Sequence, residues 1–114
     1  MAKHGIPDPL KRRHVLETDL DATKALAIAE AYLAEGRNPE AVAFLAKADA
    51  RDRLEALHGE AVAAGDVFLV REVSAALGRE VAASTWAAVA EGAAAAGKDQ
   101  YAQEARRLAG ALGG

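Results

Sequence analysis

The sequence has 114 residues, of which 52% are hydrophobic and only 4% aromatic, with a formal net charge of −3 and no cysteine. A chain of this length suits one domain with its own core. The lack of cysteine excludes a disulfide framework, a thiolate metal site and a cysteine nucleophile, and it fits the cytoplasmic location that we expect. No run approaches the roughly 18 apolar residues of a membrane span, and no apolar signal segment follows the N-terminal charges.

Alanine supplies much of the apolar fraction and makes helix the expected structure throughout. It is the strongest helix former, because its side chain loses no rotamer entropy and buries no polar group. Few β-branched or aromatic residues remain to build strands. The sequence therefore predicts an all-α protein.

A short basic helix is predicted near the N-terminus. We expect residues 1–8 to form a flexible tail, because glycine and proline there oppose helix. Asp8 can cap free backbone N–H groups, and Pro9 fits the first turn of a helix, where its missing donor costs nothing. The first helix should therefore cover residues 9–17.

The next two helices are expected over about 22–35 and 39–48. Asp19 or Asp21 can cap the first, and Asn38 followed by Pro39 repeats the start signal. Apolar residues spaced three and four apart predict the buried faces. These residues are Leu26, Ala29, Tyr32 and Leu33 in the first helix, and Val42 and Leu45 in the second.

A second pair is predicted over about 50–64 and 67–77, with Asp49 and Asp66 as the caps. The buried stripe of its first helix comprises Leu54, Leu57, Ala61 and Val62. Gly59 lies inside that helix, where glycine costs about 1 kcal/mol relative to alanine. We interpret it as a place where two helices touch closely.

A third pair is predicted after residues 79–83, which fit either a loop or a first turn. Ser84 should cap a helix over about 85–96, and Asp99 a last helix over about 100–111. Residues 113–114 should fray. The expected buried residues are Trp86, Val89 and Ala93, then Tyr101, Ala105, Leu108 and Leu112.

Glycines end the first helix of each pair and reveal an internal repeat. Gly36, Gly65 and Gly97 lie 29 and 32 residues apart, each with a polar capping residue within two positions. Periods of this size indicate stacked helical hairpins. We expect one domain over residues 9–112, with hairpins at about 22–48, 50–77 and 84–112.

Within these predicted hairpins the sequence resembles the tetratricopeptide-repeat family. The best match lies in the first hairpin, at Ala29, Tyr32, Gly36, Ala41, Leu45 and Ala48. The third hairpin matches at Trp86, Ala90, Gly97, Ala102 and Ala109 but has Arg106 where the repeat has a bulky apolar residue. In the middle hairpin, His58 replaces a small residue where the helices should touch, and Val70 replaces an alanine.

The resemblance implies a short right-handed array of three antiparallel helical hairpins, preceded by one short N-terminal helix. The repeat offsets fall short of the family's 34 residues. A looser HEAT-like or irregular array is therefore an alternative, and a compact helical bundle with other packing is a further one.

No residue pattern indicates catalysis, a cofactor or a metal site. His14 and Glu17 have the spacing at which a helix can place two metal ligands, but a di-metal bundle needs that pattern twice. His58 and Glu60, two positions apart, diverge on a helix. The stretch 92–97 lacks the lysine and hydroxyl of a phosphate-binding loop. We expect no catalytic residue, no cofactor and no metal.

Basic residues cluster at the N-terminus, although the rest of the chain is acidic. They could dock an acidic partner or another copy of the chain. We do not expect nucleic acid to bind, because no aromatic residue accompanies the cluster for stacking. This basic patch comprises Lys3, Lys11, Arg12 and Arg13.

The resemblance also implies a concave face lined by the first helix of each hairpin. Such a face would be mixed apolar and acidic, which suits a basic peptide or helix with apolar anchors. The residues that the family register places there are Thr23, Leu26, Glu30, Leu33, Asp52, Glu55, Val62, Ser84, Ala87 and Glu91.

These features predict a non-enzymatic protein–protein interaction module, a scaffold or adaptor. Self-association is the first alternative, because the sequence pattern of the C-terminal helix lacks the polar outer face expected of a capping repeat. The second alternative is a small-ligand-binding or enzymatic domain with a site near His58.

Overall fold

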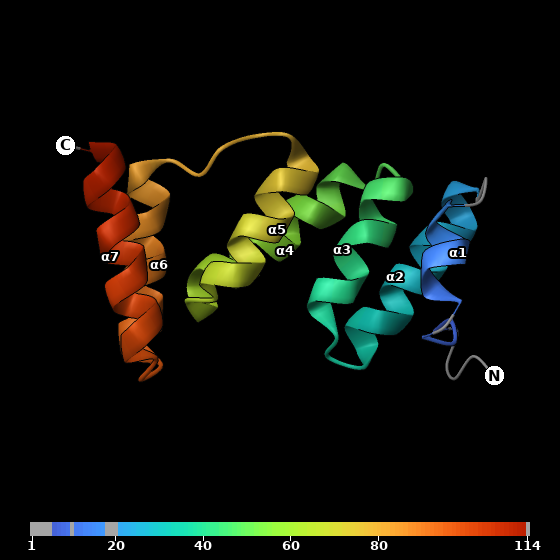
Figure 1. Ribbon diagram of the computed structural model, residues 1–114, viewed down its shortest axis with the longest axis horizontal. Coiled ribbons are helices and arrows are strands. Elements are labelled where there is room, and N and C mark those ends of the chain that lie inside the picture. The colour runs from blue at the N-terminus through green and yellow to red at the C-terminus, as the bar shows by residue number, and fades with distance from the viewer. Residues whose placement is uncertain (1–5, 10, 18–20, 114) are drawn as a thin grey trace. The chain divides into compact units, whose positions relative to one another are not determined.

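The computed structural model describes residues 6–9, 11–17 and 21–113, without the side chain of Glu17. Every regular element in this part of the chain is an α-helix (Figure 1), which confirms the all-α prediction. The helices are α1 (Arg12–Glu17), α2 (Ala22–Ala34), α3 (Asn38–Lys47), α4 (Arg51–Ala64), α5 (Val67–Leu77), α6 (Ala83–Ala95) and α7 (Asp99–Gly113). None of the helices in these ranges combines the length and apolarity needed to cross a membrane.

The first predicted helix begins later than the sequence indicates. Pro9 lies in a turn, in which the N–H of Lys11 donates to the carbonyl oxygen of Asp8 over 2.8 Å. The prediction that α1 begins at Pro9 is therefore wrong, because the chain makes this turn before it becomes helical at Arg12.

Two of the predicted side-chain caps are confirmed. The Asp21 carboxylate accepts from the N–H of Lys24 over 2.8 Å, and that of Asp66 from the N–H of Leu69 over 3.0 Å. Each aspartate thus satisfies a backbone donor that the first turn of a helix leaves free. Asp19, the other candidate for α2, lies outside the described residues.

Three other predicted caps are wrong. Asn38 is already the first residue of α3, and Ser84 the second of α6, whose N-cap residues Arg37 and Ala82 make no side-chain capping bond. Asp99 is likewise the first residue of α7. A hydroxyl, amide or carboxylate caps from the position before the helix, so these side chains stand too far along the chain.

Helix ends follow the glycine pattern, with one exception. Four glycines, at positions 36, 65, 78 and 97, take φ values of 70 to 74° within two residues of the end of a helix. Asp49 occupies the equivalent position after α3 with φ 54°, and the next N–H, of Ala50, donates to the carbonyl of Leu45 over 3.0 Å. Asp49 therefore terminates α3 instead of capping α4, and aspartate is among the few residues that tolerate this conformation.

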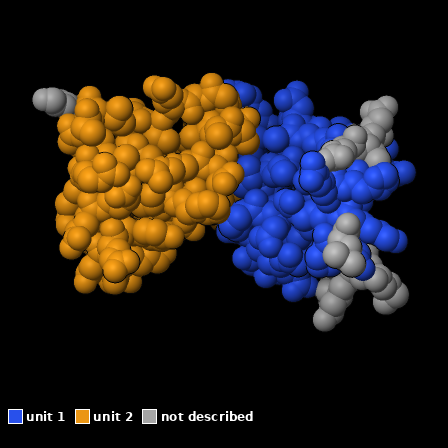
Figure 2. Space-filling view, in the orientation of Figure 1, with its two compact units in different colours: residues 1–54 blue, residues 55–114 orange. Residues whose placement is uncertain are grey.

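The chain forms two compact units, of which unit 1 covers residues 1–54 (blue in Figure 2). Within it α2 packs against α3, and α1 contacts α3. The rings of Tyr32 and Phe44 stack with their centroids 5.6 Å apart. Leu26 was predicted to be buried but is 37% exposed, because Ala25 and Ala29 form the buried face of α2 with Tyr32.

Unit 2 covers residues 55–114 (orange in Figure 2) and contains α5, α6, α7 and the C-terminal part of α4. Here α6 packs along α7, and α5 contacts α7. The predicted burial of Trp86, Val89 and Ala93 is confirmed. Other large side chains that are fully or almost fully buried in this unit are Leu57, Val70 and Val73.

The outer face of α7 differs from the prediction. Tyr101 is 39% exposed and Leu112 58% exposed, so neither is a core residue, whereas Ala105 is buried as predicted. The helix presents Gln103, Arg106 and Arg107 to solvent, together with other polar side chains of its outer face. The exposed face of α7 is therefore mixed, with polar side chains beside the apolar Tyr101 and Leu112.

Candidate functional site

An open hollow lies between α4 and α6 in unit 2, and we call it the α4–α6 hollow. Its volume is about 670 Å³. Two stretches of helix line it, one from each of α4 and α6. Each presents residues three and four positions apart, which share a helix face. The lining residues are His58, Gly59, Val62 and Ala63 of α4, and Ser84, Thr85, Ala88, Glu91 and Gly92 of α6.

Glycine and alanine line much of the hollow, and two of the glycines determine where α4 and α6 touch. A Cβ atom placed on Gly92 would lie 2.6 Å from the carbonyl oxygen of Ala63 and 2.8 Å from that of Val62, so α6 touches the α4 backbone there. A Cβ atom on Gly59 would meet nothing within 4 Å. The two helices therefore touch at Gly92 and leave space at Gly59.

The close helix contact expected at Gly59 is thus wrong, and Gly92 fills that role. A second close approach lies at the α4–α5 turn, where a Cβ on Gly65 would overlap the backbone of Ala93. Lys98 adds to this junction by donating from Nζ to the carbonyl oxygen of Ala64 over 3.0 Å. Small residues at these points fix the position of α6 against the end of α4.

Four polar side chains surround the apolar floor of the hollow: His58, Ser84, Thr85 and Glu91. None of them has a hydrogen-bond or ion-pair partner within the described residues. Elsewhere in this unit most arginines and several carboxylates are paired. The hollow thus combines an apolar surface with unpaired donors and acceptors, which is the usual make-up of a binding site.

His58 is half-buried on the rim of the hollow. Burial lowers the pKa of His58, the positive charge of Arg79 lowers this pKa further, and the negative charge of Glu55 opposes both. Arg79 and Glu55 form a bidentate ion pair, with N–O distances of 2.6 and 2.7 Å. A neutral imidazole offers one N–H donor and one nitrogen acceptor to a ligand.

The structure forms no nucleophile–base pair in the hollow. No hydrogen bond joins His58 to the hydroxyl of Ser84 or Thr85 among the described residues. A serine or threonine hydroxyl needs such a base to act as a nucleophile. In the described ranges, no three His, Asp or Glu side chains come together as a metal site either.

Three residues of the predicted concave face line the hollow: Val62, Ser84 and Glu91. Ala87 is exposed on α6 but does not line it, and Glu55 is engaged by Arg79. The structure adds the small residues Gly59, Ala63, Ala88 and Gly92, together with Thr85 and His58. Their spacing of three and four positions on two helices was the available signal.

The remaining residues of the predicted face belong to unit 1, where each is exposed or half-buried. Glu30 pairs with Arg53, whose Nε lies 3.1 Å from a carboxylate oxygen of Glu30. Leu26 is an exposed apolar side chain. The other members in this unit are Thr23, Leu33 and Asp52.

The predicted basic patch is divided by the structure. Arg12 points its guanidinium group at the aromatic pair of unit 1, 5.9 Å from the ring centroid of Tyr32 and 5.6 Å from that of Phe44. It also donates to the carbonyl oxygen of Glu40 over 3.2 Å. Arg12 therefore fastens α1 to α2 and α3, whereas Lys11 and Arg13 are exposed. Lys3 lies outside the described residues.

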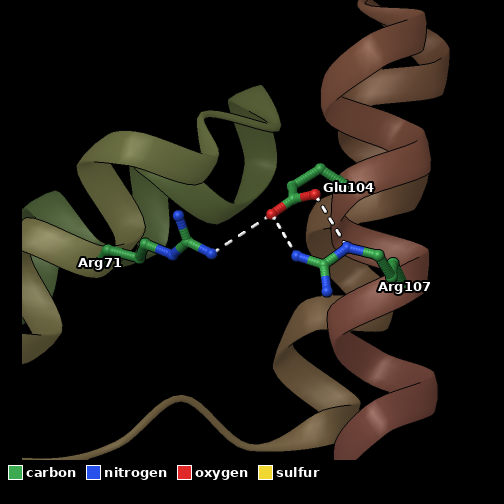
Figure 3. A network of polar contacts seen from close by, with 3 residues as sticks. All are labelled: Arg71, Glu104 and Arg107. Carbon is green, nitrogen blue, oxygen red and sulfur yellow. Dashed lines mark hydrogen bonds and ion pairs between the residues drawn. The ribbon is translucent and has the colours of Figure 1, made fainter.

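A second cluster of charges joins α5 to α7 (Figure 3). Glu104 accepts hydrogen bonds from Arg71 over 3.3 Å and from Arg107 over 2.7 Å. The hydrogen bond from Arg107 is the main cause that lowers the pKa of Glu104. Arg71 also lies over the ring of Trp86, 5.8 Å from its centroid. These groups satisfy one another, so we interpret the cluster as a structural tie.

No protein-family model matches this chain, and neither does any curated protein or solved structure.

Proposed function

We propose that this protein is a non-enzymatic interaction module, a scaffold or adaptor, that binds a peptide segment of its partner in the α4–α6 hollow. The observation that supports this proposal most is the unpaired polar rim around an apolar floor. Groups of this kind are hydrated when free and can exchange water for the polar groups of a peptide.

The shape of the hollow favours a peptide over a small molecule. From Ser84 to Glu91 the lining of α6 runs about 10 Å, since an α-helix rises 1.5 Å per residue. An extended chain covers that distance with about three residues. Pockets for small ligands enclose most of the ligand surface, whereas this hollow is open to solvent.

The packing of α4 beside α6 also supports the proposed hairpin array. These helices are the first members of the second and third predicted hairpins, and their contact at Gly92 is the kind that an array requires. We retain a tetratricopeptide-like or HEAT-like array as part of the proposal. Self-association stays the alternative, because Tyr101 and Leu112 leave apolar side chains exposed on α7.

Selection from a random peptide library on the purified protein tests the proposal. We expect enriched peptides to shift the backbone NMR signals of Ala63, Ala88 and Glu91 when added to ¹⁵N-labelled protein. Signals of the exposed residues Phe68 and Gly110, which do not line the hollow, should stay in place. A library that yields no binder, or binders that shift only signals outside the hollow, would contradict the proposal.

A further inference from the structure

We infer that the α4–α6 hollow receives a lysine or arginine side chain of the partner peptide, with its aliphatic stem on the apolar floor and its charge beside Glu91. This inference rests on the function proposed above and adds the chemistry of the occupant.

The electrostatics of the hollow favour a cation. Glu91 is the only acidic side chain among its lining residues, and no described residue neutralises it. Four cations of unit 2 are already engaged: Arg71 and Arg107 with Glu104, Arg79 with Glu55, and Lys98 with the carbonyl oxygen of Ala64. Arg106, the fifth cation of the unit, is exposed on α7 and does not line the hollow, so the carboxylate of Glu91 stays open to a charged group from a partner.

The charge of the whole unit acts in the same direction. Residues 55–114 contain five Lys or Arg residues and eight Asp or Glu residues. An acidic surface of this kind attracts a basic peptide and repels an acidic one. Charge complementarity is thus present both at the hollow and around it.

The floor of the hollow fits the stem of such a side chain. Val62, Ala63 and Ala88 present methyl groups, and Gly59 leaves the space above α4 unfilled. Lysine and arginine lay their methylene stems along apolar surfaces while the charged end stays in a polar place. The hydroxyls of Ser84 and Thr85, two turns of α6 away from Glu91, can pair with the peptide backbone.

The occupant is tested by NMR titration with five blocked pentapeptides, acetyl-Gly-Ala-X-Ala-Gly-amide, in which X is Lys, Arg, Gln, norleucine or Glu. The Lys and Arg peptides should shift the signals of Ala88, Glu91 and Gly92. Norleucine keeps the stem without the charge and should bind about three- to fivefold more weakly, as expected when an ion pair with an exposed carboxylate is lost. The Glu peptide should not bind.

Two matched variants locate the charge effect. Glu91→Gln should weaken the Lys peptide about three- to fivefold, as expected for an exposed carboxylate. Glu72→Gln removes an exposed carboxylate of α5 that does not line the hollow, and it should leave the affinity within about twofold.

The failure of this inference differs from the failure of the proposed function. Norleucine or Glu peptides that bind as tightly as Lys, no response to any of the five peptides, or Lys binding that survives Glu91→Gln would each overturn the cationic occupant. The peptide-binding function itself is decided by the library selection.

Discussion

At the scale of single residues, contacts in the folded chain give several side chains roles that their place in the sequence does not predict. Arg12 was predicted to be part of an open basic patch but packs over Tyr32 and Phe44. Asp49 was predicted to start a helix but ends one. His58 was the misfit of the middle hairpin, and it lies on the rim of the hollow.

His58 should make the stability of the protein depend on pH. Its folded-state pKa is lowered, so folding favours the neutral imidazole, mainly because of burial and then because of Arg79; Glu55 opposes, and Glu91 lines the same hollow. The stabilisation is present above the unfolded pKa, near 6.5, and is lost as the pH falls through the lower folded value.

Chemical denaturation at pH values between 7.5 and 5 measures this effect. The free energy of unfolding of the wild type should fall across this interval, and His58→Gln should flatten the fall. A variant whose pH dependence matches the wild type would show that His58 has no such role.

At the scale of helices, the two glycines of the hollow should respond in opposite ways to substitution. Gly59→Ala adds a Cβ atom to empty space and should raise the free energy of unfolding by about 1 kcal/mol. Gly92→Ala places a Cβ atom against two backbone oxygens of α4, which cannot move as a side chain can, and should lower it by about 1–3 kcal/mol.

Urea denaturation of both variants checks this pair, with Gly110→Ala as the control. Gly110 lies in α7 with free space around its Cβ position, so its alanine variant should behave like Gly59→Ala. Equal stabilisation by Gly59→Ala and Gly92→Ala would mean that α6 does not touch α4 at Gly92.

The sequence predicts the helices well because their signals are local. Glycine after a helix and aspartate before one act within a turn, so the ends at Gly36, Gly65 and Gly97 and the caps at Asp21 and Asp66 could be predicted. The bounds of α5 agree to the residue.

The errors in helix starts and buried faces arise where two residues, or two faces of one helix, fit the same local pattern. Alanine is a strong helix former, and α6 starts at Ala83, one residue before the predicted cap Ser84. On α2 an alanine stripe and a leucine stripe overlap, and the alanines are buried, which leaves Leu26 exposed. In an alanine-rich helix the apolar pattern alone does not determine which face is buried.

The hollow could be predicted only in part, because it depends on contacts between distant segments. The family register predicts three of its lining residues, Val62, Ser84 and Glu91. The small residues around them could not be predicted, because they line the hollow only when α6 packs against α4. Gly59 and Gly92 look alike in the sequence, and only their neighbours in space separate the open position from the closed one.

At the scale of the whole molecule, charge distinguishes the two compact units. Residues 1–54 contain nine basic and nine acidic residues, whereas residues 55–114 are net acidic. The unit that contains the hollow is therefore also the one whose net charge favours the basic peptide proposed above. This agreement between local site and overall charge is what the proposed interaction module requires.

The most direct test of the central claim is the affinity of a library-selected peptide for two leucine variants, measured by isothermal titration calorimetry. Gly59→Leu fills the hollow without a clash at Cβ, whereas Gly110→Leu adds the same side chain to an exposed position of α7. Both changes replace glycine inside a helix, so both should keep the fold. We expect Gly59→Leu to weaken binding at least about 10-fold, as steric blockage of a cost near 1.4 kcal/mol would do, and Gly110→Leu to bind like the wild type. Equal binding by both variants would show that the peptide does not lie in the α4–α6 hollow.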